Sequence, residues 1–245
     1  MDKDLIEDLK LRLIEGLTIL AGENVMDGFG HLSARIPGTD TFLINPRYPG
    51  ALADVEDICT VDLNGKRVAG SRPIPSETPI HTAVYRSRPD VNSVIHCHPH
   101  YSVIFGLTGR EIVPFFRQAG ILADGVPAFP ESAIIDTREL ADRMTRSLGD
   151  HRVALLHGHG IVSAGPTIET NCITAIQLER TCADQLLLMQ FTAPEPLPDL
   201  SPRSNDPGQA PPSRYWPFLQ LKHGVKSREQ IKAEMRLPPD PPGSV

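Results

Sequence analysis

Several features that would place a chain in a membrane or outside the cell are absent from this sequence. No uninterrupted apolar run approaches the ~18 residues that a transmembrane helix needs. The N-terminus, Met1–Asp4, leads directly into an amphipathic pattern and lacks the apolar core of a signal peptide. The cysteines are few, scattered and flanked by hydrophobic residues, which is typical of reduced thiols. We therefore expect a cytoplasmic protein without a membrane partner.

An excess of positive charge is also absent. The formal net charge of −6 argues against nucleic acid or an anionic membrane surface as the main partner. It leaves an anionic small molecule possible as a substrate, because a metal ion and one arginine can set the local field. With 245 residues, of which 40% are hydrophobic and 22% charged, the chain can bury a full core and has the composition of an ordinary globular protein. It contains no internal repeat.

The hydrophobic pattern predicts an alternation of helices and short strands. Apolar residues at three- and four-residue spacing predict a helix over residues 3–22. A second helix is expected over 77–88, with Ser76 as its candidate N-cap. Further helices are expected over 100–107, 137–148 and 167–191. Strands are expected at 32–36, 41–45, 58–63, 93–98, 121–123, 126–128 and 153–156. Asn64-Gly65 after the third of these is a hairpin signal.

The composition changes after Phe191. Residues 194–217 are rich in Pro, Ser and Asp and cannot build a core, so they read as an extended arm. The only tryptophan lies in the segment 216–219, which we expect to dock on the rest of the protein. Residues 226–236 are charged and are expected to form a solvated helix, and 238–245 to be disordered. We therefore divide the chain into a folded domain, 1–192, and a Pro-rich C-terminal arm, 193–245, that is partly docked.

The segment Val94–His100 carries three histidines at every second position. Side chains alternate between the faces of a strand, so His96 and His98 point the same way, within reach of one ion. Cys97 then points to the opposite face, where it fills the core. Neutral imidazole suits Zn²⁺ and also Mn²⁺, Fe²⁺ and Co²⁺. The alternative for a single such pair is a histidine-rich loop that binds nothing.

A second pair of histidines, His157 and His159, lies where another predicted strand meets a loop. Open α/β sheets place their ligands at such strand ends. Two His-x-His pairs at strand ends are far less expected by chance than one. Glu77, at the start of a predicted helix, supplies a carboxylate. These residues together favour a metal site over a loop without function.

The motifs Pro75-Ser76-Glu77, Ser93–His98 and Leu155–Gly160 resemble those of the class II aldolase/adducin family. The resemblance runs from about residue 5 to 192. It implies an α/β fold of three layers, α/β/α, around a central and mostly antiparallel sheet. It makes residues 1–192 the catalytic domain. It also implies ring-like homotetramers with sites between subunits, where Tyr215 of the docked arm would reach a neighbour's site.

Carried over residue by residue, the resemblance makes His96, His98 and His159 the ligands of one divalent ion per subunit, Mn²⁺ or Zn²⁺. Three histidines with an open position are also what a catalytic metal site requires. The resemblance makes Glu77 the catalytic acid/base, able to approach the ion when substrate is absent. His157 aligns with a variable position and is a candidate substrate contact, a group behind the ligands or an uninvolved histidine. His81 and His100 we regard as structural.

The chain departs from the sugar-phosphate enzymes of the family at three loops. Those enzymes hold phosphate with Gly-Asn-Ser-like and Ser-Gly loops and with a Ser-Ser pair before the Glu. Here His31 replaces the asparagine, Arg47 a small residue and Pro75 one serine. A fork-shaped guanidinium beside an imidazole suits a planar carboxylate. The candidate substrate contacts are His31, Ser33, Arg47, Ser76, His157 and Tyr215. The alternatives are an exposed loop arginine for Arg47 and a buried structural role for His31.

With these three replacements, the sequence resembles one branch of the family. The enzymes of that branch decarboxylate hydroxylated aromatic or heteroaromatic dicarboxylic acids in degradative pathways. The leading hypothesis is thus a metal-dependent carbon–carbon lyase acting on a small carboxylate. Glu77 would move the proton at the reacting carbon. Its main alternative is an aldolase cleaving a non-phosphorylated hydroxy-keto acid. An adducin-like binding module without catalysis, which has no reason to keep the three His and the Glu, and a sugar-phosphate epimerase are the remaining readings.

Overall fold

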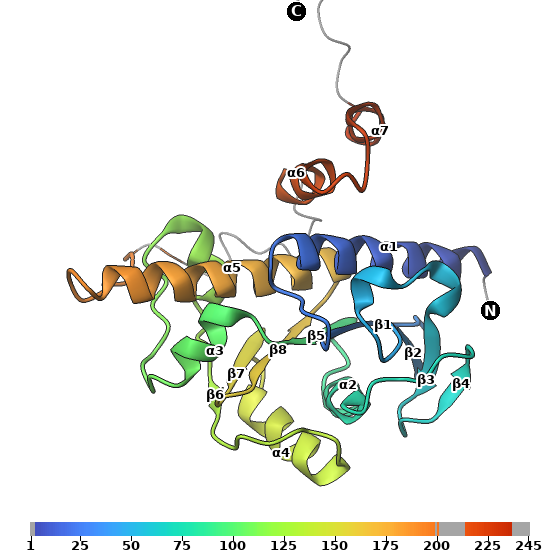
Figure 1. The fold of residues 1–245 in the computed structure, drawn as a ribbon, viewed down its shortest axis with the longest axis horizontal. Helices are drawn as coiled ribbons and strands as arrows, with labels where there is room; N and C mark the ends of the chain where they lie inside the picture. Colours follow the sequence, from blue (N-terminus) through green and yellow to red (C-terminus); the bar gives the residue numbers. More distant parts are fainter. Residues whose placement is uncertain (1–2, 199, 201–213, 237–245) are drawn as a thin grey trace, which may run out of the picture.

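One eight-stranded sheet forms the centre of the computed structural model, which describes residues 3–198, 200 and 214–236 (Figure 1). The strands are β1 (His31–Arg35), β2 (Thr41–Ile44), β3 (Cys59–Asp62), β4 (Arg67–Ala69), β5 (Ser93–Cys97), β6 (Ala128–Phe129), β7 (Val153–Leu156) and β8 (Gly160–Gly165). Their order in the sheet is β4-β3-β2-β1-β5-β8-β7-β6. All neighbouring strands are antiparallel except β6 and β7, which are parallel.

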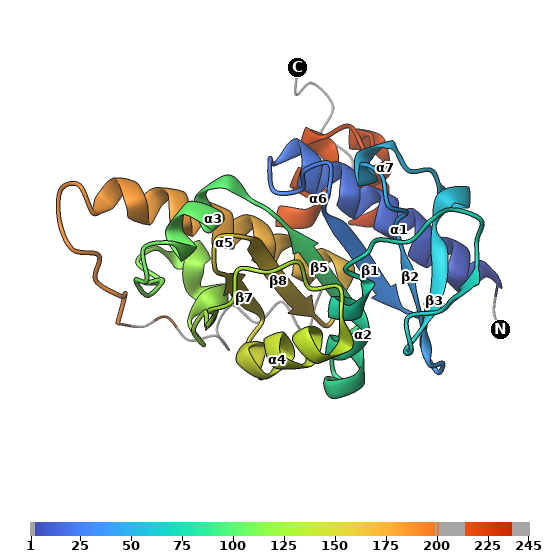
Figure 2. The same cartoon turned by 60° about the horizontal axis from the view of Figure 1, so that its bottom comes forward.

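Helices cover both faces of this sheet. They are α1 (Lys3–Gly22), α2 (Thr78–Ser87), α3 (His100–Gly106), α4 (Arg138–Leu148), α5 (Ile168–Leu188), α6 (Tyr215–Lys222) and α7 (Arg228–Glu234), with 3₁₀ turns at Gly50–Leu52, Val55–Asp57 and Arg117–Leu122. Helices α1 and α5 lie on one face, and α2 and α4 on the other (Figures 1 and 2). Two separate clusters of buried apolar side chains fill the spaces between the sheet and the helices on its two faces. The expected three-layer α/β/α fold with a mostly antiparallel sheet is confirmed. Among the described residues, no helix has the length and apolar character needed to span a membrane.

Strand β5 lies in the middle of the sheet and is buried along its whole length. Its side chains alternate: Val94 belongs to the core under α2 and α4, whereas Ile95 and Cys97 belong to the core under α1 and α5. His96 therefore faces the α2 side, opposite Cys97. The predicted role of Cys97 as core filler is confirmed. In the register with β1, His96 pairs with His31, which brings two segments of distant sequence together at one strand end.

Most predicted elements are confirmed to within three residues, and two predictions are wrong. The N-cap of α2 is Glu77 and not Ser76, because the helix begins at Thr78 with a proline in its first two positions. The segment 121–123 is not a strand, because residues 117–122 form a 3₁₀ turn that buries Ile121 and Leu122 in the core beneath α5. A short apolar run does not distinguish these states by periodicity.

The C-terminal arm docks through α6, as predicted from its tryptophan. Trp216 and Leu219 are buried in the core cluster shared with α1 and α5. The Gln220 side chain donates to Glu15 Oε2 at 2.8 Å, and Lys222 and His223 both meet Glu23 Oε1 at 2.6 Å. Helix α7 follows and confirms the helix expected over 226–236. The prediction of disorder for 238–245 lies outside the described residues, as does most of the predicted extended arm.

We expect Leu219→Ala to destabilise the docking of α6 by about 2–5 kcal/mol, the usual cost of truncating a fully buried leucine. Trp216 is the only tryptophan, so its fluorescence reports this helix alone. In a denaturant titration, the Trp216 emission should shift to longer wavelength before the far-UV circular dichroism is lost. Leu221→Ala is the matched control, because Leu221 lies in the same helix and is exposed. Equal midpoints for the two variants would contradict the docking role of Leu219.

Candidate active site

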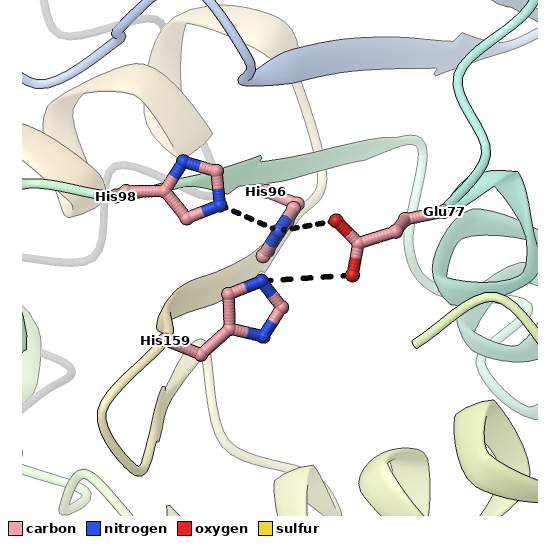
Figure 3. Close-up of side chains that lie close together, drawn as sticks. All are labelled: Glu77, His96, His98 and His159. Atoms are coloured by element: carbon pink, nitrogen blue, oxygen red, sulfur yellow. Dashed lines mark hydrogen bonds and ion pairs between the residues drawn. The ribbon is translucent and has the colours of Figure 1, made fainter. Parts of the chain in front are cut away.

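Four side chains from three parts of the chain converge at the end of β5. Glu77 stands at the N-cap of α2, His96 and His98 at the end of β5, and His159 in the turn between β7 and β8. One ligand atom from each lies within 4.8 Å of the others. Figure 3 shows the three rings and the carboxylate pointing toward one another. The residues that the sequence analysis selected as metal ligands and acid/base are therefore neighbours in space.

The distances within this cluster match a metal site. His98 Nε2 lies 3.2 Å from His96 Nε2, His96 Nε2 lies 3.3 Å from Glu77 Oε2, and His159 Nε2 lies 3.6 Å from Glu77 Oε1. In a tetrahedral site with bonds of about 2.0–2.1 Å, ligand atoms are about 3.3 Å apart. The spacing and the donor set, three imidazoles and a carboxylate, thus fit a divalent ion.

Hydrogen bonds on the far side of two rings set their tautomers. His96 Nδ1 donates to the Ile161 carbonyl oxygen at 2.9 Å, and His98 Nδ1 donates to Asp27 Oδ2 at 3.0 Å. Both partners can only accept, so the Nδ1 atoms carry the protons and the Nε2 lone pairs face each other. Two facing lone pairs at 3.2 Å repel unless a cation lies between them. A buried Nδ1 of His159 has no hydrogen-bond partner among the described residues.

Glu77 is ionised in this arrangement. Its burial alone would raise the carboxyl pKa, but the neighbouring rings of His159 and His96 and the N–H of Ile135, which donates to Oε1 at 2.7 Å, hold that pKa well below its usual range. Burial lowers the pKa of His96, although Glu77 opposes this shift. Carboxylates bind a cation in their ionised form and imidazoles through an unprotonated nitrogen.

A cavity of about 360 Å³ opens onto the cluster. Its walls consist of Gly28–His31, Pro46–Tyr48, Pro75–Glu77, His98, Ile134 and His159. Three predicted substrate contacts, His31, Arg47 and Ser76, therefore share one cavity with Glu77. Arg47 is exposed, and its guanidinium makes no hydrogen bond or ion pair within the described part of the chain. It is free to bind an anion in the cavity.

Ser33 does not line this cavity, contrary to its selection as a substrate contact. It lies on the same face of β1 as His31 but two residues deeper, where α2 covers it completely. Ser33 Oγ is 2.6 Å from His81 Nδ1 and 2.7 Å from the Tyr85 hydroxyl, and His81 Nε2 is 2.6 Å from His31 Nδ1. Burial lowers the pKa of His81 to about 3, so its ring is neutral. Ser33 thus supports His31 through His81, which agrees with a structural role for His81.

Two further predicted contacts lie away from the cavity within one chain. His157 is exposed, and the left-handed turn at Gly158 (φ 61°) directs the chain back so that His159, not His157, reaches the cluster. Tyr215 begins α6 and packs on the α1 and α5 side of the sheet, whereas the cluster faces α2 (Figure 1). Its role at a neighbour's site stays a prediction.

The sequence analysis missed Asp27, Phe29 and Ile134. Asp27 meets His98 across 71 positions of the chain, and no local pattern signals such a pairing. Phe29 and Ile134 are large apolar residues on the cavity wall that are mostly exposed, Phe29 to 82%. A signal for Phe29 lies in the sequence, because it stands between Gly28 and Gly30, and two glycines so close together allow the backbone to approach a ligand.

The fold is that of a known family. The model of the Class II Aldolase and Adducin N-terminal domain matches residues 12–186. The chain belongs to the class II aldolase and adducin family.

Its relatives include decarboxylases. The chain is 38% identical over 176 residues to a 3,4-dihydroxyphthalate decarboxylase of Arthrobacter keyseri, which covers 66% of this chain and 71% of the relative. It is 35% identical to the enzyme of the same name from Terrabacter sp. (strain DBF63), over 66% of this chain and 73% of that relative. Relatives of this kind support a lyase.

Solved structures support the fold. An L-fuculose 1-phosphate aldolase from Glaciozyma antarctica PI12 superposes with a TM-score of 0.74 at 23% identity, over 89% of this chain and 91% of that one. An aldolase II superfamily protein from Pseudomonas syringae superposes with a TM-score of 0.80 at 21% identity, over 92% of this chain and 95% of that one.

Proposed function

We propose that the protein is a metal-dependent decarboxylase of a hydroxylated aromatic or heteroaromatic dicarboxylic acid in a degradative pathway of the cytoplasm. The observation that carries this proposal is one cavity that holds both the Glu77–histidine cluster and the free guanidinium of Arg47. A substrate with one carboxylate to lose and another to be held fits such a cavity. The decarboxylase relatives support the same reaction.

His96, His98 and His159 would hold one Mn²⁺ or Zn²⁺ ion, for which their spacing and tautomers are suited. When bound, such an ion supplies Lewis-acid stabilisation of the negative charge that develops next to the reacting carbon. The chain's own contribution is to orient two of the three ligand lone pairs before the ion arrives. His96 and His98 do this through their hydrogen bonds to Ile161 and Asp27.

Glu77 would act as the general base and then as the general acid. Because its carboxylate is ionised, it begins as a base and takes the proton of the ring hydroxyl. It then returns this proton to the ring carbon, while the carbon–carbon bond to the departing carboxylate breaks and CO2 leaves. Water restores the proton of the ring oxygen, so the overall change is one proton in and one CO2 out. The Ile135 N–H holds Oε1 at 2.7 Å and orients the carboxylate for this transfer.

Arg47 would bind the second carboxylate. Its planar fork can donate two parallel hydrogen bonds to a carboxylate, which fixes the orientation of the ring as well as its position. His31, held by the buried His81, and Ser76 would provide further polar contacts in the same cavity. Phe29 and Ile134 supply apolar wall for the ring faces. The small-molecule partner is thus a planar acid with two carboxylates.

Membership of the family supports an oligomeric assembly. We propose a homotetramer with sites between subunits, in which Tyr215 and His157, both away from the cavity of their own chain, contact the site of a neighbour. We also propose residues 1–192 as the catalytic domain and 193–245 as the C-terminal arm. Analytical ultracentrifugation of the full chain, and of a chain ending at residue 192, tests both statements.

The reaction is tested by product analysis. Hydroxylated aromatic and heteroaromatic dicarboxylic acids are incubated with metal-loaded protein, and CO2 release is measured. Non-phosphorylated hydroxy-keto acids are incubated in parallel, and pyruvate or aldehyde release is measured. We expect CO2 from the first group only. Aldehyde or pyruvate from the second group, without CO2 from the first, would make the protein an aldolase.

Removal of a group that hydrogen-bonds to a metal ligand lowers metal affinity by about 10–100-fold. We expect His159→Ala to lower the affinity by more than this. It removes one of three imidazole donors outright. Metal content after dialysis, by atomic absorption, measures this loss. His157→Ala is the matched control, because His157 lies two residues away and is exposed. Full occupancy in His159→Ala would show that His159 is not the third ligand.

A further inference from the structure

We propose that Asp27 is a positioning residue that couples the metal ligand His98 to the loop Gly28–Gly30 on the cavity wall. The inference rests on the proposed metal site but not on the proposed substrate. It concerns how one carboxylate links two parts of the site that are distant in sequence. The coupling makes metal binding and the order of the substrate-facing loop depend on each other.

The two oxygens of Asp27 serve two different partners. Oδ1 accepts hydrogen bonds from the backbone N–H groups of Phe29 and Gly30, at 3.0 and 2.9 Å. Oδ2 accepts from Nδ1 of His98 at 3.0 Å. Both carboxylate oxygens of Asp27 are therefore hydrogen-bonded, one to the loop and one to His98. A shift of either partner disturbs the bond to the other.

His98 depends on this contact more than His96 does. His96 lies within β5, and its Nδ1 donates to a carbonyl of the adjacent strand β8, so the sheet itself fixes the ring. His98 lies beyond the last residue of β5, just before Pro99, where strand pairing no longer restrains it. The Asp27 carboxylate is the protein group that sets its tautomer and ring orientation. A metal-bound histidine with a carboxylate partner is also a stronger ligand.

The loop Gly28–Gly30 is tied to the same strand. A Cβ on Gly30 would lie 3.1 Å from the His96 carbonyl oxygen and 3.0 Å from Cys97 Cβ, so only glycine allows this approach to β5. The loop presents Phe29 to the cavity with 82% of its surface exposed. Few apolar contacts hold such a residue, so its position depends on the backbone hydrogen bonds to Asp27.

These contacts predict a reciprocal effect. A cation at Nε2 polarises the His98 ring and strengthens the hydrogen bond from Nδ1 to Asp27. A better-held Asp27 in turn better holds the N–H groups of Phe29 and Gly30. Thermodynamic linkage then requires that an ordered loop also increases metal affinity.

The test uses metal alone, Mn²⁺ or Zn²⁺, without substrate. Affinity is measured by calorimetric titration, and the loop by amide hydrogen exchange of a peptide spanning residues 26–32. In the parent protein, metal should slow exchange at Phe29 and Gly30. In Asp27→Asn, the amide oxygen can still accept from the loop, but the amide N–H₂ faces His98 and favours the tautomer with a proton on Nε2. Metal affinity should fall about 10–100-fold, and the loop should no longer respond to metal.

Asp90→Asn is the matched control, because Asp90 pairs with Arg88 near the opposite end of β5 and is exposed. It should keep both the affinity and the loop response. Either unchanged affinity in Asp27→Asn or metal-insensitive loop exchange in the parent would overturn the coupling, and the second measurement needs no variant. A parent that binds no metal would instead overturn the metal site, whereas a failure to release CO2 would leave this inference standing.

Discussion

Glu77→Gln is expected to lose most turnover, by about a hundredfold or more, while metal binding and fold remain. The glutamine side chain keeps the shape of the carboxylate and can still accept from the Ile135 N–H, but it cannot take up a proton. Steady-state rates at saturating metal, with metal content determined on the same sample, measure the effect.

Glu169→Gln provides the matched control for this experiment. Glu169 is a similarly buried carboxylate in the first turn of a helix, paired with Arg12 on the opposite side of the sheet. Its substitution should lower stability but leave the rate per folded molecule unchanged. If Glu77→Gln loses metal and regains nearly full activity when metal is restored, Glu77 is a ligand only and the proton comes from elsewhere.

Arg47→Lys is expected to lose about ten- to a hundredfold in kcat/KM although the positive charge remains. The lysine ammonium is a point charge without the planar guanidinium, so the bidentate hydrogen bonds to a carboxylate are lost. The corresponding loss in transition-state binding is roughly 1.5–3 kcal/mol, as for a hydrogen bond to a charged group. Arg143→Lys, in an exposed pair with Glu131 outside the cavity, should have no effect.

A substrate analogue shows whether Arg47 contacts the second carboxylate. An analogue without the second carboxylate should be converted poorly by the parent and about equally poorly by Arg47→Lys. The four rates form a cycle that yields the coupling between the guanidinium and that carboxylate. Additive losses, or efficient cleavage of a sugar phosphate by the parent, would falsify the carboxylate assignment and favour an aldolase.

Glu77 illustrates how a small local error can matter for function. The sequence places it in the first turn of a helix with Ser76 as the cap, whereas the helix begins one residue later and Glu77 itself is the N-cap. The side chain does not cap its own helix and instead reaches His96, His159 and the N–H of Ile135. Helix boundaries depend on contacts from other segments, here the 135 loop, and short-range propensity does not contain them.

Local periodicity by itself determined a large part of this protein. The two-residue alternation of a strand puts His96 and His98 on one face and Cys97 on the other, and the 3.6-residue repeat marks α1 and α5. These rules come from the geometry of the backbone within one element, so they hold wherever the element lies. They were sufficient to place His96 and His98 side by side, whereas the choice of His159 and Glu77 came from the resemblance to the family.

Only the tertiary structure decided which residues stand beside that cluster. Ser33 and His31 share a strand face and are both buried, but only His31 lines the cavity, because α2 covers Ser33. Asp27 meets His98 across 71 positions, and Tyr215 docks on the opposite side of the sheet. Such contacts depend on how the sheet and helices pack over the whole chain, and residue spacing within a single element carries no information about that packing.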